Sequence, residues 1–451
     1  MRLLLSWRLS CAALLALIPL ATAGCGADSS AAPSSPPNTL QDASEDQDAS
    51  LGEEAQPPDA AGADHLAPDS DSPDAGKADA AATDAIDDEA QEAADDGATD
   101  APSADADGST ACTPAVYGPA GTPIPIVGFG EGTLGGLQPG HDTFHVTSLD
   151  DDGDGTLRRG LQTNGSPRIV VFDPDGTIFL QTALLVPSNI TVDGRGRSIV
   201  LNGKGMVIPG SDEVILINLA FENVGPESED GVQIGSAAPD PSEHVVLDHL
   251  RFSQLTGQGS CKYVDEAISV IYGSRFITIA HCKFDFWEKV LLAGNGDAEP
   301  SLDAQITLTM HHSYANETGR RHPQARYGKY HFYNNYLDDW RMYGWAFEAP
   351  YFESFGHQIQ DNGRMLLEGE MVRRRNHTYD LGSQANDASR CELGGDLLEH
   401  GTWIDPETTV SLKFGAGCAQ KEGIVPPYSA CIENADADLR DRVMSSSGNS
   451  L

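Results

Sequence analysis

Positive charge is scarce in this sequence. Lys and Arg together number 28 against 68 Asp and Glu residues, which gives a formal net charge of -40 at pH 7. With this balance we expect no nucleic-acid partner. The few cations are informative for the same reason, because isolated positive charge in an acidic protein is often placed to meet an anion. Lys289, Arg321 and Arg326 stand out because they fall inside a repeating strand pattern, although each alone could be a solvated surface residue.

Large apolar residues are almost absent from Gly26 to Thr110, a stretch that is mainly Ala, Asp, Ser and Pro. Such a composition cannot bury enough apolar surface to fold. We therefore expect residues 25–111 to form a disordered, acidic Ala/Asp-rich linker. A flexible segment of this length can hold a folded domain well away from its point of attachment.

A long apolar run is present only near the N-terminus, from Leu9 to Ala23, and two arginines flank its start. It is too short for a membrane-spanning helix and is typical of a secretory signal peptide over residues 1–24. Small residues directly before Cys25 favour a lipoprotein-type signal with lipidation of Cys25 over simple secretion. The expected location is secreted or on the cell surface of a bacterial envelope, with the outer membrane contacted only through a lipid anchor.

Cysteine is also sparse, with eight residues in the chain and no paired Cys-x-x-Cys motif of the kind that binds zinc. An even number in an exported protein favours disulfides. Cys261 and Cys282 are about one coil of the repeat apart and could pair with each other, while the pairing of the others stays open. Six cysteines follow Cys25: Cys112, Cys261, Cys282, Cys391, Cys418 and Cys431.

The middle of the chain repeats itself. Repeats at such periods are typical of stacked coils, and apolar first and third positions in each repeat predict strands with one face inward. We therefore expect residues 112–451 to form one all-β solenoid. Five eight-residue segments carry the pattern, and they start 31, 32, 31 and 22 residues apart at Val214, Val245, Ile277, Leu308 and Tyr330.

The fifth position of each segment is polar. In a stack of strands these side chains would lie one above another at a turn and hydrogen-bond along the axis, which is a better interpretation than a catalytic role. The uneven spacing of the segments indicates loops of variable length, and such loops can build one wall of a binding groove. The residues of this predicted ladder are Asn218, His249, His281, His312 and Asn334.

Seven motifs give the chain a resemblance to the pectate lyases of polysaccharide lyase family 1, from about Val127 to Trp340. The resemblance implies a right-handed parallel β-helix that acts as a monomer and cleaves α-1,4-linked polygalacturonate by β-elimination, giving unsaturated oligogalacturonides. The motifs, in the order of the family, are V-G-F-G-E-G-T-L-G-G at Val127, G-T-L-R at Gly155, V-D-G-R-G at Val192, V-V-L-D-H at Val245, K-V-L-L-A-G at Lys289, Arg321-x-Pro323-x-x-Arg326 and Asn334-Asn335-Tyr336.

The chemistry of a polyuronate agrees with the three cations. Each sugar carries a carboxylate, and removal of the neighbouring proton requires that charge to be offset as a carbanion-like transition state develops. Lys289 offers a point charge and Arg326 a bidentate fork for binding this carboxylate. By the resemblance, Arg321 occupies the position of the catalytic base at carbon 5. Crowding by neighbouring cations would favour the neutral form that a base needs.

Calcium is the cofactor that the resemblance implies, held between acids on neighbouring coils. Asp230 and Asp265 keep two of the four acid positions, while Ser228 and Ser269 stand at the other two. The two aspartates could still share a hard cation with carboxylates of the substrate. The alternative is that these acids only cap turns. Two adjacent acids could help as further ligands, Glu229 and Glu266.

Other functions stay open at this point. The two serines at acid positions point to a pectin lyase, which acts on methyl-esterified chains without calcium, although neither position carries an extra Arg. A glycosidase would need two carboxylates about 5 to 10 Å apart, and no motif for its general acid is visible. A non-catalytic polyuronate-binding solenoid would keep the ladder and the cations without needing Arg321. The preferred methylation, endo or exo action and the role of residues 341–451 are not determined by the sequence.

Overall fold

The computed structural model describes residue 112 and residues 115–451, apart from residues 226–229, 237–239, 255–264, 296–299, 341–354, 377–385 and 420. The predicted signal peptide and linker, the lipidation site Cys25, the possible ligand Glu229 and the cysteine Cys261 lie outside these described residues. Within them, no helix is long and apolar enough to cross a membrane.

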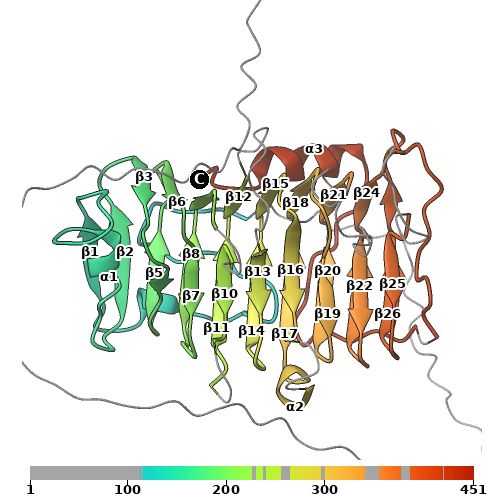
Figure 1. Ribbon diagram of the computed structural model, residues 1–451, viewed down its shortest axis with the longest axis horizontal. Helices are drawn as coiled ribbons and strands as arrows, with labels where there is room; N and C mark the ends of the chain where they lie inside the picture. Colours follow the sequence, from blue (N-terminus) through green and yellow to red (C-terminus); the bar gives the residue numbers. More distant parts are fainter. Residues whose placement is uncertain are drawn as a thin grey trace, which may run out of the picture. The chain divides into compact units, whose positions relative to one another are not determined.

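The described residues form three parallel β-sheets that share their coils, as expected for a right-handed parallel β-helix (Figure 1). Each coil passes from a strand of sheet A to one of sheet B, then to one of sheet C, and each strand pairs with its equivalent one coil away. Sheet A contains β1 (Asp142–Val146), β2 (Arg168–Phe172), β5 (Ile190–Asp193), β8 (Val214–Ile217), β11 (Glu243–Asp248), β14 (Arg275–Ala280), β17 (Thr307–His311), β20 (Lys329–Tyr333), β23 (Arg364–Glu368) and β26 (Asp396–His400).

The other two sheets complete the coils. Sheet B contains β3 (Gly176–Phe179), β6 (Ile199–Asn202), β9 (Ala220–Glu222), β12 (Arg251–Ser253), β15 (Lys283–Asp285), β18 (Tyr314–Asn316), β21 (Tyr336–Asp338), β24 (Met371–Arg373) and β27 (Trp403–Ile404). Sheet C contains β4 (Leu184–Leu185), β7 (Met206–Ile208), β10 (Val232–Ile234), β13 (Glu266–Val270), β16 (Lys289–Ala293), β19 (Gln324–Arg326), β22 (His357–Gln360) and β25 (Ser389–Cys391). The strands therefore continue beyond Trp340, where the sequence resemblance ends.

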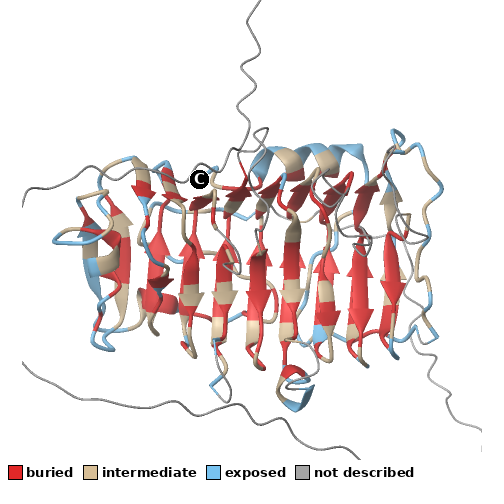
Figure 2. Ribbon diagram, in the orientation of Figure 1, coloured by how far each residue is buried: buried red, intermediate tan, exposed pale blue. Residues whose placement is uncertain are grey.

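The repeat positions of the sequence coincide with the strand register. The first residues of the five segments are partners in sheet A, and the apolar first and third residues lie in one core inside the coils (Figure 2). The eighth residues of the segments are register partners in sheet B. Three of them are phenylalanines, Phe221, Phe252 and Phe284, whose rings stack with centroids 5.0 and 5.2 Å apart. Because each ring packs on the next coil, the core is continuous along the helix.

The predicted polar ladder is confirmed. Its residues follow the sheet A strands at the turn to sheet B, and all of them have a positive φ, between 51° and 56°. Asn and His tolerate this left-handed conformation better than most residues, which explains their use at the turn. Successive rings of His249 and His281 stack at 4.7 Å between centroids. Asn218 instead donates a side-chain hydrogen bond to the carbonyl of Gly194 at 2.7 Å.

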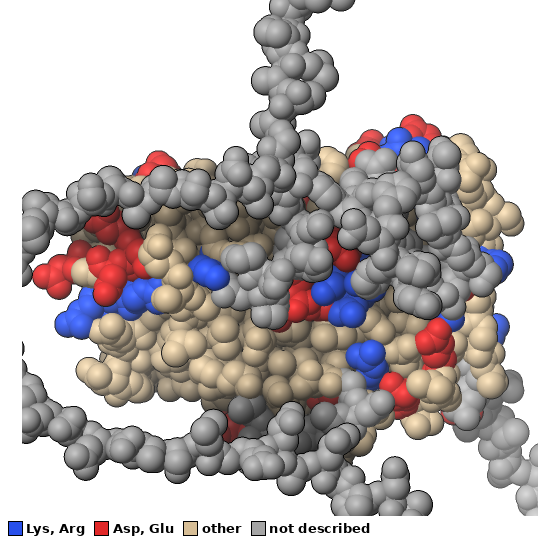
Figure 3. Space-filling view, viewed as in Figure 1, with Lys and Arg blue, Asp and Glu red and all other residues tan. Residues whose placement is uncertain are grey.

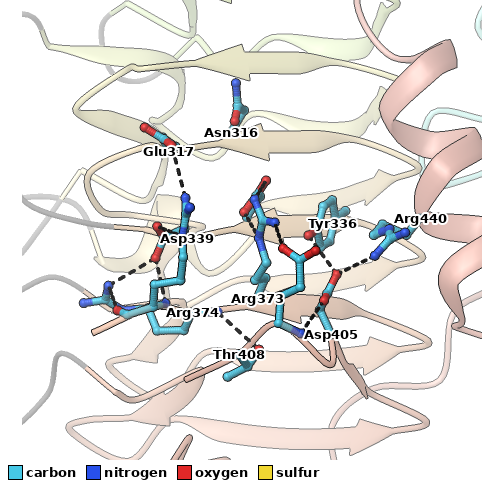
Figure 4. A network of polar contacts seen from close by, with 12 residues as sticks. Asn316, Glu317, Tyr336, Asp339, Arg373, Arg374, Asp405, Thr408 and Arg440 are labelled. Carbon is cyan, nitrogen blue, oxygen red and sulfur yellow. Dashed lines mark hydrogen bonds and ion pairs between the residues drawn. The ribbon is translucent and has the colours of Figure 1, made fainter. Parts of the chain in front are cut away.

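The C-terminal segment returns along the ladder after the last strand. Its helix α3 (Ala437–Ser446) lies over sheet B in Figure 1 and buries Leu439 and Val443 against aromatic residues of that sheet. Arg440 of α3 binds Asp405 at 2.8 Å, as Figure 4 shows. Short helices are η1 (Gly135–Leu137), α1 (Leu157–Gly160) and α2 (Pro300–Asp303).

Two disulfides join four of the five described cysteines, Cys112 with Cys431 and Cys391 with Cys418. The first connects the start of the described chain to the returning C-terminal segment, and the second joins neighbouring parts of the last coils. The suggested pairing of Cys261 with Cys282 is wrong, because Cys282 carries a free thiol. Cys282 occupies the sixth position of its repeat, and this position points into the core, where the thiol is fully buried.

Candidate active site

The candidate site lies on sheet C and on the connections that enter it from sheet B. Lys289 is the first residue of β16 and is the register partner of Glu266, the first residue of β13. Asp265 directly precedes β13, and Arg326 ends β19. Since equivalent positions of successive coils lie one strand spacing apart, about 4.8 Å, these residues are brought together although they are far apart in the sequence.

Three carboxylates form the acidic part of the site. Oxygen atoms of Asp230, Asp265 and Glu266 lie within 4.8 Å of one another. Asp230 accepts a hydrogen bond from the backbone N–H of Glu266 at 3.0 Å and a second, short one from the hydroxyl of Ser269. The structure thus brings Asp230 and Asp265 together on neighbouring coils, as expected. Ser269, which stands where an acid was expected from the resemblance, is a hydrogen-bond donor to this cluster.

Each of the three cations is paired with an acid. The Lys289 ammonium lies 2.6 Å from Asp265, and the Arg321 guanidinium forms an ion pair with Glu266. Arg326 lies 3.5 Å from Asp361. The three pairs are neutral when every acid is ionised, and Asp230 adds one further negative charge. These described groups therefore carry one more negative than positive charge.

Burial changes the ionisation of the central groups. It lowers the pKa of Arg321 to about 10, and the nearby charge of Arg326 acts in the same direction. The expected crowding by cations is therefore present but is the smaller cause. Burial also raises the pKa of Asp230 to about 7, partly against the hydrogen bond from Ser269. A carboxylate with this pKa lies in a site that lacks enough positive charge to stabilise its ionised form.

Arg320 and Arg321 are adjacent in sequence but have different partners. Arg320 forms a β-bridge with Lys289 through its backbone, while its guanidinium lies 3.4 Å from Glu288. Arg321 has a positive φ of 64°, and this turn of the backbone directs the two side chains to different acids. The guanidinium of Arg321 forms the ion pair with Glu266 of the acidic cluster. The distinction made from the R-x-P-x-x-R spacing is consistent with this geometry.

Sequence reasoning missed Asp361 as the partner of Arg326, and it considered Glu266 only as a metal ligand. Asp361 directly follows β22, the strand one coil after the strand that ends at Arg326. Its position next to Arg326 could have been predicted from the repeat only if the length of the loop between the two strands were known. Figure 3 shows basic and acidic side chains side by side on the face in view, with broad uncharged areas around them. This mixture fits a site in which cations are held in place by acids.

Comparisons with known proteins agree with this fold, a parallel β-helix that groups acids and cations on one sheet. A family model described as pectate lyase matches residues 155–392. A probable pectate lyase of Solanum lycopersicum is 32% identical over 238 residues, covering 48% of this chain and 56% of that relative. Pectate lyase D of Dickeya chrysanthemi is 27% identical over 287 residues, covering 59% and 71%. The chain thus spans little more than half the length of the tomato relative.

Solved structures are similar in fold. The major allergen from cedar pollen superposes with a TM-score of 0.57 at 23% identity, covering 72% of this chain and 92% of the allergen. A point variant of the Bacillus subtilis pectate lyase gives 0.56 at 17% identity, covering 72% and 96%. Because the family model matches more than half of the sequence, the chain belongs to the pectate lyase family.

Proposed function

We propose that this protein is a polysaccharide lyase, a pectate lyase that cleaves α-1,4-linked polygalacturonate by β-elimination. The observation that carries the proposal is that a guanidinium with a lowered pKa, that of Arg321, lies about one-fifth exposed among acids and two further cations on sheet C. A base of lowered pKa beside fixed cations is the combination that proton removal next to a carboxylate requires.

In the proposed reaction Arg321 acts as the base. Its neutral form takes the proton from carbon 5 of a galacturonosyl unit, the electron pair forms the double bond between carbons 4 and 5, and the bond from carbon 4 to the glycosidic oxygen breaks. Water supplies a proton to the leaving oxygen. Glu266 holds the guanidinium of Arg321 in position through their ion pair, so the base does not have to be ordered during the reaction.

Lys289 and Arg326 bind the carboxylate of the same sugar in this proposal. Both side chains are about one-fifth exposed, so they are reachable from solvent while their pairing with Asp265 and Asp361 limits their motion. As negative charge develops on the sugar, fixed cations of this kind stabilise it without reorganisation.

We propose calcium as the cofactor, held by Asp230 and Asp265. Carboxylate oxygens are the ligands that calcium prefers, and the described groups of the site are short of positive charge. Glu266 is engaged by Arg321, so the remaining ligands would come from water and from the substrate. When bound, the ion supplies the additional positive charge that a polyanionic substrate needs.

One assay tests activity and cofactor together. Polygalacturonate and highly methyl-esterified pectin are each incubated with the enzyme, with and without a chelator, and the ultraviolet absorbance of the unsaturated product is followed. We expect activity on polygalacturonate that is lost with chelator and restored by Ca²⁺. Faster, chelator-resistant cleavage of esterified pectin would instead favour the pectin lyase alternative. Reducing ends without the absorbance would show hydrolysis, and binding without cleavage would show a non-catalytic solenoid.

We further propose that the enzyme is a monomer displayed on the outside of a bacterial envelope, with a lipid on Cys25. The support is the residue pattern before Cys25 and the acidic linker that follows it. Expression of the parent and of Cys25→Ser, followed by membrane fractionation, tests this. Equal membrane attachment of the two proteins would contradict a lipid anchor at Cys25.

A further inference from the structure

A second cluster of titratable side chains lies at the turn between sheets A and B, in a different corner from sheet C. His281 and His312 occupy the same ladder position on successive coils, and His311 is the last residue of β17. One ligand atom from each of these three histidines lies within 4.8 Å of the others. No acid of the candidate active site belongs to this group.

The rings are arranged around a common point. His311 is nearly perpendicular to both His281 and His312, at 83° and 88°, with centroids 5.3 and 5.2 Å apart. The Nδ1 atoms of His311 and His312 face each other at 3.0 Å. Two imidazole nitrogens bound to one tetrahedral zinc ion are about 3.3 Å apart, given Zn–N bonds of about 2.0–2.1 Å. Small ring rotations would therefore suffice to bind one ion.

Two of the three rings contact a carboxylate through the nitrogen that would not bind the ion. Nδ1 of His281 lies 3.1 Å from Asp248, and Nε2 of His312 lies 3.1 Å from Glu433. Carboxylates in such positions are the usual outer partners of metal-binding histidines, because they fix the tautomer and ring orientation. These contacts leave Nε2 of His281 and Nδ1 of His312 for a ligand.

His311 is nine-tenths buried, and its Nδ1, which faces Nδ1 of His312, is the nitrogen that it would present to the shared ion. The flanking acids supply the compensating charge.

We propose that His281, His311 and His312 form a binding site for a transition-metal ion that prefers imidazole, of the class of Zn²⁺. Nitrogen-only donors separate this site from the carboxylate cluster on sheet C, which suits calcium. Glu433 belongs to the returning C-terminal segment, and the hydroxyl of Tyr117, near the start of the described chain, lies 3.2 Å from Nδ1 of His281. A bound ion would therefore fasten both terminal segments to the β-helix. The proposal does not depend on the lyase activity.

The ladder itself provides matched variants. Asn218 and Asn334 occupy the same turn position with the same positive φ, so Asn is compatible with the fold at this position. His281→Asn and His312→Asn each remove one proposed ligand. His249→Asn is the control, because it makes the same change in the same ladder but leaves the three imidazoles in place. Circular dichroism checks that each variant is folded.

Zinc binding is measured by isothermal titration calorimetry on the full chain without a histidine tag, in saturating Ca²⁺ so that carboxylate sites are occupied. We expect one zinc ion per parent chain, a rise in melting temperature on zinc addition, and at least about 100-fold weaker binding in His281→Asn and His312→Asn. His249→Asn should bind within about threefold of the parent. Glu433→Gln, which keeps all three ligands, should weaken binding about 10–100-fold. Absorbance of the Co²⁺-loaded protein reports whether the geometry is tetrahedral.

Two outcomes would overturn the proposal. One is the absence of stoichiometric zinc binding by the parent chain. The other is zinc binding by both His281→Asn and His312→Asn with the affinity of the parent, which would locate the ion elsewhere. If His281→Asn does not fold, His312→Asn and Glu433→Gln still decide between these results.

Discussion

Replacement of Arg321 by Lys separates two accounts of this residue. Lysine keeps a positive charge and has a similar basicity, with an ordinary pKa of about 10.4 against the lowered pKa of about 10 for Arg321. If Arg321 served only as a charge, the variant would remain active. If it is the base, the shorter, single-nitrogen side chain loses both the ion-pair geometry with Glu266 and the reach toward carbon 5.

We expect Arg321→Lys to lower kcat by at least about 100-fold, the usual scale for loss of a positioned base. This corresponds to about 2.7 kcal/mol of transition-state stabilisation. The assay is the initial rate of ultraviolet absorbance on polygalacturonate in saturating Ca²⁺, with reducing ends measured in parallel. Arg320→Lys is the matched control and should stay within about threefold of the parent, because the guanidinium of Arg320 pairs with Glu288 and a lysine keeps the charge.

The pH dependence gives a second, independent test of the same residue. A base must be deprotonated, so kcat/KM should rise with pH until about the pKa of Arg321, which is about 10. At pH 8 only about 1% of Arg321 would be neutral, and each unit of pH should then increase the rate about tenfold. The assignment would be refuted by an Arg321→Lys variant as active as the parent, or by reducing ends that appear without absorbance.

Three further predictions concern stability. Replacement of both Cys112 and Cys431 by Ser should lower the free energy of unfolding by about 2–5 kcal/mol, because this disulfide joins residues that are 319 positions apart. Urea denaturation measures the loss. Cys282→Ala is the control, because it removes a free thiol and leaves both disulfides intact. Phe252→Ala should cost about 3–5 kcal/mol because the ring is fully buried in the sheet B stack, whereas Phe179→Ala, with the ring 63% exposed, should cost less than about 1 kcal/mol; equal losses would contradict the packing argument. Burial lowers the pKa of His322 to about 3, so below about pH 6.5 the unfolded chain binds a proton that the folded chain does not. The free energy of unfolding should therefore decrease as the pH is lowered, by up to about 1.4 kcal/mol per pH unit. His322→Gln should flatten this slope between pH 6.5 and 4, and an unchanged slope would show that other groups control it.

The sequence was sufficient to predict the β-helix because its repeat is expressed at the positions that the fold constrains most. Apolar residues at the first and third positions face the core, and the fifth position needs a residue that tolerates positive φ. The predicted proximity of Asp230, Asp265 and Lys289 rested on their place in the repeat together with the resemblance to the family. These features depend on spacing within one coil, which a single sequence displays.

Contacts that depend on loops or on the returning C-terminal segment were not predictable. The pairing of Cys112 with Cys431 joins residues from opposite ends of the folded chain, and no period in the sequence links them. The same holds for Leu451, whose backbone N–H donates to the side chain of Asn218 at 2.9 Å. The wrong pairing of Cys282 arose because spacing indicates the coil to which a residue belongs but not whether its side chain faces inward.

The histidines of the ladder show how one position can serve two purposes. The turn between sheets A and B requires residues that accept positive φ. Asn218 and Asn334 meet this need, and their side chains donate hydrogen bonds to backbone carbonyls of neighbouring coils. Histidine meets the same backbone requirement, but its ring extends further and carries a second nitrogen. At His281 and His312 a carboxylate contacts one ring nitrogen, and the other nitrogen of His312 faces His311, which ends the strand before the turn. Backbone geometry therefore selects the residue type, and the neighbouring acids determine whether its free nitrogen can bind a metal.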